Sequence, residues 1–583
     1  MKTTKYFLSM AALALVGAMT VSCSSDDNIT DQPQQQEVTK SNVVTLTTTV
    51  SLDGGATTRA LSIEGNKGVK TFAAGETMAI YYWKNKGNDH VKAVSAPLTA
   101  GDITNGGKSA TFTFTLDNPY KEMSVVYTYP AAMANADFTP NYDALYNNQD
   151  GTLATLASNF DFCTRSGAWV GDNLPSLTLE NQLAILAITL KDEAGTSDIT
   201  SGTTKLTVSD GTNTYNVNRS ATEGPIYVAI RPTTEATIDI TATSGGKGYY
   251  KTLTTTKSYA ASNGYPVSWK MTQGANLSKL TAAYTAQNGD KLTGTLGSNV
   301  KISIADGASV TLKDVTINGE NNESYKWAGI TCEGDATIIL SGTNTVNGFY
   351  EDYPGVFVPS GSTLSTLTIQ GTGVLNASSN GYGAGIGGGN QINCGNIVIK
   401  SGTINATGGK EAAGIGSSDN GECGDITING GIVTATGGEY ADGIGIGRGM
   451  SGKCGDITIN GGSVTARGGS NGAGIGGWSN GSSRTTINIT GGNVVATGGE
   501  KAAGIGSGDD LCCNINISGG AGTATKGAGA ECSIGRAIFF TDYDDPSTNP
   551  CGTISISGIV GVGVSTYTLE CTSETCTWQN SNP

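Results

Sequence analysis

The sequence predicts an all-β protein with two N-terminal β-sandwich domains followed by a C-terminal right-handed parallel β-helix. A glycine-rich unit recurs through the C-terminal half, and its central isoleucines are separated by 29, 29, 31 and 30 residues (Ile386, Ile415, Ile444, Ile475 and Ile505). A period of about 30 residues built from short strand-like pieces is typical of a solenoid with stacked coils. The N-terminal half has many short strand-like runs and no repeat, which is typical of sandwiches.

Each repeat supplies short strands that are apolar on one face only. Ile426 and Ile428 alternate with Thr427 and Asn429, which turns one face inward and the other to water. Pieces of four or five residues are too short to be stable alone, so each must pair with the equivalent piece of the next copy. Equivalent positions then form columns with a spacing of roughly 4.8 Å. We therefore expect the five central isoleucines to fill the core as one column.

Changes in composition along the chain give the expected domain boundaries. We expect a signal peptide over residues 1–22, a flexible tether over 23–41, a first sandwich over 42–150, a second over 151–273, and the β-helix over 274–583. The chain carries a formal net charge of −15 and a pI near 4.6. Nucleic acid is therefore excluded as a partner, because it carries charge of the same sign.

The N-terminus has the features of an export signal. Lys2 and Lys5 precede an apolar run from Phe7 to Val16, which is too short to span a bilayer. The segment Val21-Ser22-Cys23 resembles a bacterial lipoprotein signal, which implies lipid attachment at Cys23. The following Ser-Ser-Asp-Asp resembles a tag that sends lipoproteins to the outer face of the outer membrane. The alternative is an ordinary secretory signal.

Residues 40–275 resemble the fimbrillin family, the subunits and associated proteins of lipoprotein-derived pili. Four segments carry this resemblance: 72–80 (FAAGETMAI), 126–131 (VYTYPA), 177–184 (LTLENQLA), read as the opening strand of the second sandwich, and 226–232 (IYVAIRP). The resemblance implies a surface protein of the cell outer membrane that is associated with a fimbrium.

Arg59 directly follows the first expected strand. In fimbrillins an arginine at this place is where a protease removes the leading strand, so the resemblance implies donor-strand exchange with other fimbrillin subunits. The alternative is a solvated loop cation. The chain continues into roughly 300 residues of β-helix where shaft subunits end in a donor strand, which suits a tip or side-displayed adhesin better than a shaft subunit.

The candidate binding residues are aromatic and acidic side chains in the loops of the solenoid. Aromatic faces stack on sugar rings, and carboxylates accept sugar hydroxyls or hold calcium, which stays open as a ligand. This part of the chain also resembles β-helix modules labelled carbohydrate-binding. The candidates are Trp327, Tyr350, Glu351, Asp352, Tyr353, Tyr382, Tyr440 and Trp478. The alternative is that Phe349 and the neighbouring tyrosines cap the end of a coil.

No catalytic residue is assigned, and no cofactor is expected. The single histidine, His90, lies in the sandwich region, while Asp425 and Asp456 occupy the same turn of successive repeats. Polysaccharide lyases and glycosidases need clustered or suitably spaced carboxylates. We therefore expect an adhesin for a glycan or a host-surface ligand. Two alternatives stay open: an extracellular polysaccharide lyase or hydrolase, and a structural spacer.

The cysteines fall into two groups. Cys394, Cys423 and Cys454 recur at the same place in successive repeats, and three thiols in one column cannot all pair, so a stack of buried thiols is expected. Cys571 and Cys576 lie close together near the C-terminus and are expected to form a disulfide. The segment 539–550 breaks the repeat and is expected to cover the last coil.

Overall fold

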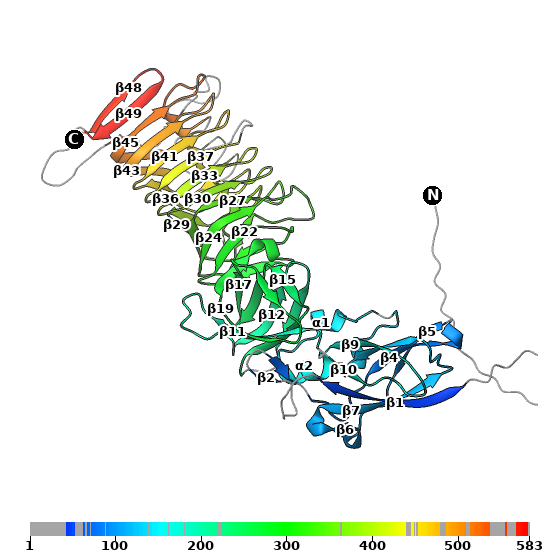
Figure 1. Cartoon of the computed structure of the whole chain (residues 1–583). Helices are drawn as coiled ribbons and strands as arrows, with labels where there is room; N and C mark the ends of the chain where they lie inside the picture. Colours follow the sequence, from blue (N-terminus) through cyan, green and yellow to red (C-terminus); the bar gives the residue numbers. More distant parts are fainter. Residues whose placement is uncertain are drawn as a thin grey trace, which may run out of the picture.

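The computed structural model describes residues 42–52, 62–64, 67–69, 71–87, 89–137, 139–160, 162–179, 181–219, 223–361, 364–438, 445–447, 449, 453–477, 485–508, 513–536, 554–556 and 567–580. The signal peptide, most of the tether, the covering loop 539–550 and the predicted positions Cys23, Arg59, Tyr440 and Trp478 lie outside these residues. Within them, no helix has the length and apolar character that crossing a membrane requires. Figure 1 shows the N-terminal sheets at one end of an elongated molecule and a ladder of stacked strands at the other.

The first sandwich consists of two four-stranded sheets with a shared apolar core. One sheet has the order β10-β1-β7-β6 and the other β5-β4-β8-β9. Alternate residues of β7, such as Phe112, Phe114 and Leu116, are fully buried, as the period of two along a strand requires. The strands are β1 (Val43–Leu52), β2 (Ser62–Glu64), β3 (Lys67–Val69), β4 (Ala79–Lys84), β5 (Asp89–Val94), β6 (Ile103–Thr104), β7 (Ser109–Asp117), β8 (Ser124–Tyr129), β9 (Cys163–Ala168) and β10 (Leu177–Leu179).

The boundary between the sandwiches differs from the expected one at residue 150. Helices α1 (Asp143–Asn147) and α2 (Leu153–Asn159) place Leu145 and Leu156 in the core of the second sandwich. The chain then returns to the first sandwich, where β9 pairs with β8 and β10 pairs with β1. The segment 177–184 therefore does not open the second sandwich: its first three residues close the first one, and the second opens with β11.

The second sandwich packs the sheet β14-β11-β19 against the strands β12, β13, β16 and β17. Gln149, which is buried, links α1 to β14, because its side chain bonds the backbone of Leu145 and of Ala229. The strands are β11 (Ala184–Lys191), β12 (Thr203–Ser209), β13 (Thr214–Asn218), β14 (Ile226–Ile230), β15 (Thr233–Ala236), β16 (Asp239–Ser244), β17 (Lys247–Thr252), β18 (Lys257–Tyr259) and β19 (Gly264–Lys270).

Strand β20 (Thr272–Asn276) joins the second sandwich to the solenoid. It pairs antiparallel with β17 and parallel with β22 (Lys291–Thr295). One sheet therefore runs from the sandwich through the whole solenoid, and the expected start at residue 274 falls inside β20.

The solenoid is a parallel β-helix, as the sequence predicts. Every pairing from β20–β22 to β45–β47 is parallel, and each strand meets its equivalent in the next coil. The inward residues of these strands form one continuous core. One sheet contains β21 (Tyr284–Ala286), β23 (Ile302–Ile304), β25 (Ile330–Cys332), β28 (Val356–Phe357), β31 (Ile386–Gly387), β34 (Ile415–Gly416), β38 (Ile446–Gly447), β42 (Ile475–Gly477), β44 (Ile505–Ser507) and β46 (Ile534–Arg536).

The remaining faces of the coils belong to the long sheet, with β35 and β39 paired separately. Their strands are β24 (Ala308–Ile317), β26 (Ala336–Ser341), β27 (Thr343–Asn347), β29 (Thr366–Gly371), β30 (Val374–Ser378), β32 (Asn396–Ile399), β33 (Thr403–Thr407), β35 (Glu422–Cys423), β36 (Ile426–Ile428), β37 (Ile432–Thr436), β39 (Lys453–Cys454), β40 (Ile457–Ile459), β41 (Ser463–Arg467), β43 (Thr486–Thr497), β45 (Asn514–Thr525), β47 (Ile554–Ile556), β48 (Tyr567–Cys571) and β49 (Thr575–Asn580). The short 3₁₀ turns are η1 (Asn85–Gly87), η2 (Ala100–Asp102), η3 (Asn105–Gly107), η4 (Ala131–Met133) and η5 (Leu277–Lys279).

The isoleucine column forms, with one correction. Ile446, not Ile444, pairs with Ile415 and with Ile475. Ile446 precedes Ile457 by the same 11 residues that separate Ile415 from Ile426, so the distance to the next strand decides which isoleucine enters the column. Ile444 itself lies outside the described residues.

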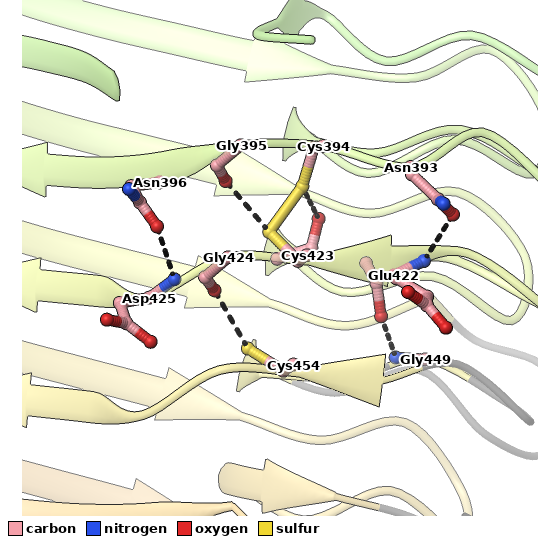
Figure 2. Close-up of a disulfide and its surroundings, with 12 residues drawn as sticks. Asn393, Cys394, Gly395, Asn396, Glu422, Cys423, Gly424, Asp425, Gly449 and Cys454 are labelled. Atoms are coloured by element: carbon pink, nitrogen blue, oxygen red, sulfur yellow. Dashed lines mark hydrogen bonds between the residues drawn. A yellow bond between two sulfur atoms is a disulfide. The ribbon is translucent and has the colours of Figure 1, made fainter. Parts of the chain in front are cut away.

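The cysteine column contains a disulfide, and the predicted stack of three thiols is wrong. Cys394 and Cys423 are bonded, with 4.5 Å between their Cα atoms, which is within the range that a disulfide spans. Figure 2 shows Cys454 one coil further on, where its thiol lies 3.7 Å from the carbonyl oxygen of Gly424. Stacked coils bring equivalent cysteines closer together than the spacing of the repeat in the sequence suggests.

A hairpin closes the end of the solenoid. Strands β48 and β49 pair antiparallel, and β49 also pairs antiparallel with β45 of the last long coil. Cys576 is disulfide-bonded, and the residue opposite it in the hairpin is Cys571. This is the place where the sequence predicts the bridge between these two cysteines.

Candidate functional site

Loops on one side of the solenoid stack on one another, and we call residues 348–355, 379–385 and 408–414 the loop edge. The backbone N–H of Gly383 donates to the carbonyl oxygen of Glu351 (3.2 Å), and that of Gly409 donates to Gly383 (2.9 Å). These bonds continue the spacing of the coils into the loops. Side chains from separate repeats therefore lie along one edge of the molecule.

Four of the predicted residues form one turn of the loop edge. The N–H of Tyr353 donates to the carbonyl oxygen of Tyr350 (3.0 Å), which closes the turn around Glu351 and Asp352. The Lys326 ammonium lies 5.8 Å from the centroid of the Tyr350 ring, within the range of a cation–π interaction. Desolvation and the charges of Glu351 and Asp352 raise the pKa of Tyr350, so its hydroxyl stays protonated and can donate at neutral pH.

Asp352 is held in place by the next coil. The side-chain amide of Asn390 donates to its Oδ1 (3.0 Å), and the backbone N–H of Asn390 donates to its carbonyl oxygen (3.0 Å). A carboxylate fixed in this way keeps its orientation before a ligand arrives, which reduces the entropy lost on binding.

Tyr382 repeats the arrangement of Tyr350 on the neighbouring loop. Its backbone N–H donates to Glu351, and the Lys410 ammonium lies 5.6 Å from the centroid of its ring. The structure thus brings Tyr350, Glu351, Asp352 and Tyr382 together on adjacent loops. The two lysines were missed in the sequence, although Lys410 precedes the repeated Ala-Gly-Ile element closely enough to be placed on this edge.

Trp327 packs beneath the loop edge. Its ring centroid lies 5.8 Å from that of Phe349, and both rings contact Tyr325. Phe349 is fully buried in the solenoid core, as the capping alternative predicts for it. Nε1 of Trp327 is buried, and none of the described residues accepts a hydrogen bond from it. Trp327 therefore supports the loop that carries Tyr350.

The carboxylates of the repeats form a ladder that the sequence did not reveal. A side-chain oxygen in one coil accepts the backbone N–H of the equivalent residue in the next coil, at distances of 2.7 to 3.0 Å. The acceptors are Asp306, Asp335, Asn396, Asp425 and Asp456. Figure 2 shows one step of the ladder, from Asn396 to Asp425. Asp425 and Asp456 thus hold successive coils in register. A column of Asp, Asn and Thr just before each buried strand is the signal that could have identified it.

The ladder gives a test of register. Asp425→Ala removes the acceptor for the N–H of Asp456, and we expect it to lower the free energy of unfolding of the solenoid by about 1 kcal/mol. Asp425→Asn is the matched control, because Asn396 fills the same role one coil earlier. Urea denaturation of both variants measures the difference. Equal losses in the two variants would contradict the assigned role.

No cluster of three or more His, Cys, Asp or Glu side chains that could hold a metal ion occurs among the described residues. Calcium binding stays a prediction for which these residues offer no ready site of that kind.

A family model described as a beta helix repeat matches residues 367–390, 397–419, 426–447, 457–481 and 487–509. The matched segments follow the stacked strands from β29 to β44. Residues 367–509 are a run of beta helix repeats. These beta helix repeats contain the disulfide, two of the three loops of the loop edge and most of the acceptor ladder. No curated protein matches the chain.

Among solved structures, several similar ones come from related bacteria. A Bacteroides ovatus ATCC 8483 protein assigned to cell adhesion is 11% identical, with a TM-score of 0.25 and coverage of 40% of this chain and 97% of that one. A fimbrial assembly protein from Parabacteroides distasonis ATCC 8503 is 12% identical, with a TM-score of 0.22 and coverage of 40% and 96%. The tip fimbrial protein Mfa3 from Porphyromonas gingivalis is 11% identical, with a TM-score of 0.19 and coverage of 39% and 95%.

Proposed function

We propose that this chain is a fimbria-associated surface adhesin that binds glycans along the loop edge of its beta helix repeats. The observation that carries the proposal is the pair of tyrosines, Tyr350 and Tyr382, on stacked loops with Glu351 and Asp352 between them. Tyrosine rings supply stacking area for sugar rings, and the carboxylates accept sugar hydroxyls. A lysine beside each tyrosine adds hydrogen-bond donors at the same place.

The spacing of the loops favours an extended ligand over a small one. Loops of successive coils are joined by backbone hydrogen bonds, so equivalent side chains repeat along the edge as the strands do. An oligosaccharide can contact several such loops at once, and each further contact raises the affinity without a deep cleft.

The N-terminal half supports a location at the cell surface. Cys23 would carry the lipid that anchors the chain in the outer membrane, and the fimbrillin-like segments within residues 40–275 would attach it to a fimbrium. Strand β1 lies between β7 and β10 in the first sandwich. Cleavage at Arg59 followed by loss of β1 would leave a gap in this sheet, which a strand from another subunit could fill.

Binding of the full chain to a glycan array tests the proposal. We expect the Tyr350→Ala and Tyr382→Ala variants each to lose affinity on the order of tenfold, because each removes one stacking ring. Tyr120→Ala is the matched control: this tyrosine also has a carboxylate neighbour, Glu122 at 2.7 Å, but it lies in the first sandwich.

The same assay separates the other functions. Retention of a glycan without a product supports the adhesin. New reducing ends or unsaturated sugars would replace it with a hydrolase or a lyase, and no retention of any glycan would leave a structural spacer. Equal binding by the wild type and both loop-edge variants would place the binding site elsewhere on the chain.

A further inference from the structure

A groove lies where the second sandwich meets the solenoid, and its floor is the outer face of a sheet. Thr207 of β12, Thr241 of β16 and Tyr250 of β17 lie opposite one another on adjacent strands. Their neighbours along the strands, Leu206 and Ile240, are buried in the sandwich core. The alternation of a strand therefore places the threonines and Tyr250 on the outer face.

The chain that enters the solenoid forms the wall of this groove. Turn η5 and the residues up to Tyr284 lie beside the floor and enclose a space of about 250 Å³ with Lys205, Thr243 and Tyr250. A second space of about 500 Å³ continues it past Thr214 and Asn216. The two spaces share Thr207, Thr241 and Lys279. We call the whole the junction groove; it has the size of a small-ligand site.

The wall is held rigidly. The Tyr284 hydroxyl donates to Asp290 (2.6 Å), a fully buried carboxylate that also accepts from the N–H of Gln287 and the amide of Gln273. Lys279 pairs with Asp239 at 2.8 Å. Because these contacts exist without a ligand, little ordering of the wall remains to oppose binding.

Several polar groups of the floor have no partner within the described part of the chain. No hydrogen bond or ion pair there engages the Lys205 ammonium, the Thr241 and Thr243 hydroxyls or the Tyr250 hydroxyl. Burial raises the pKa of Tyr250 to about 12, so this hydroxyl remains a donor. These groups border an open space and can therefore serve a ligand.

The charge balance of the groove indicates the sign of the ligand. Asp239 neutralises Lys279, while Lys205 adds one positive charge. The two carboxylates whose charge reaches Tyr249 and Tyr250 are engaged elsewhere, Asp290 with Tyr284 and Glu193 with Lys291. A single cation beside a hydroxyl-lined floor and a tyrosine ring suits a carboxylated sugar. A phosphate would be held better by several cations or a bidentate arginine.

We propose that the junction groove is a second binding site, which takes an oligosaccharide bearing a carboxylate. Lys205 pairs with the carboxylate, the Tyr250 ring stacks on a sugar ring, and the Thr241 and Thr243 hydroxyls bond sugar hydroxyls. This site lies apart from the loop edge and does not depend on the function proposed there.

Calorimetric titration of the full chain tests the proposal with three probes: oligogalacturonate, a hyaluronan oligosaccharide and sialyllactose, each beside its methyl ester. We expect at least one acid to bind on the order of tenfold more tightly than its ester, because the ester cannot pair with Lys205. Lys205→Gln should remove this preference, and Tyr250→Ala should weaken both forms. Lys205 is exposed, so its substitution leaves the fold intact, and Tyr250→Phe retains the ring as a further control.

The loop-edge variants distinguish the two sites. The Tyr350→Ala/Tyr382→Ala double variant should bind the acid as the wild type does. The proposal is overturned if none of the three acids binds, if Lys205→Gln keeps the preference for the acid over the ester, or if binding is lost only in the loop-edge variant.

Discussion

Replacing Gly416 by alanine should lower the free energy of unfolding of the solenoid by more than about 4 kcal/mol. Gly416 follows the buried Ile415 with φ +136°, and a Cβ atom there would overlap the carbonyl oxygen of Gly447 in the next coil. The obstacle is backbone, so no side-chain movement relieves it. Equivalent glycines in the neighbouring coils have φ between +130° and +138° and the same close approach (Gly387, Gly447, Gly476 and Gly506). The expected damage is therefore a break in the stack rather than a local distortion.

Gly307→Ala separates this close approach from backbone strain. Gly307 lies in the same solenoid with φ +71°, and a Cβ atom there would meet nothing within 4 Å. Alanine should cost about 1–2 kcal/mol at this position, because only the left-handed conformation opposes it. Urea denaturation followed by circular dichroism measures both variants. Similar losses in the two would show that conformation alone, and not the contact between coils, requires glycine at Gly416.

The repeated core was predictable because two periods coincide in it. Alternation along a strand assigns Ile426 and Ile428 to the inside, and the repeat of about 30 residues assigns their partners Ile457 and Ile459. The exception, Ile446, arises in the sequence Gly-Ile-Gly-Ile-Gly, where two isoleucines fit the local motif equally well. Only the distance to the next strand separates them, so the motif alone was insufficient.

The return of the chain to the first sandwich could not be read from the sequence. Strand β10 pairs Leu177 with Val50 across more than 120 residues, and nothing in a three-residue strand indicates a partner so distant. Helices α1 and α2 were also missed. They have five and seven residues, too few for an amphipathic period to stand out.

The candidate sites differ in the same way. Tyr350, Glu351 and Asp352 were identifiable because they are adjacent in a loop that interrupts the repeat. Their partners Lys326 and Asn390 come from other loops and depend on how the coils stack. In the junction groove, strands that begin at Thr203 meet a wall that ends at Tyr284. This arrangement exists only because β20 makes one sheet of two domains.

Trp578→Ala should destabilise the C-terminal end of the solenoid by about 3–5 kcal/mol. Trp578 is 1% exposed and belongs to the solenoid core. It lies opposite Gly522 of β45, where a Cβ atom would overlap the tryptophan ring. The ring therefore fills space that this glycine leaves, and it fastens the hairpin β48–β49 over the last coil. Its loss would expose the edge of β45, which can then pair with another chain.

Trp578→Phe is the control for this prediction. Nε1 of Trp578 is buried, and no described residue accepts a hydrogen bond from it, so phenylalanine loses volume but no hydrogen bond. We expect phenylalanine to retain most of the stability. Hydrogen exchange of the β45 amides should rise in the alanine variant and stay near the wild-type rate in the phenylalanine variant, and size-exclusion chromatography should show aggregates for alanine alone. Unchanged exchange of β45 in Trp578→Ala would mean that the hairpin does not hold the end of the solenoid.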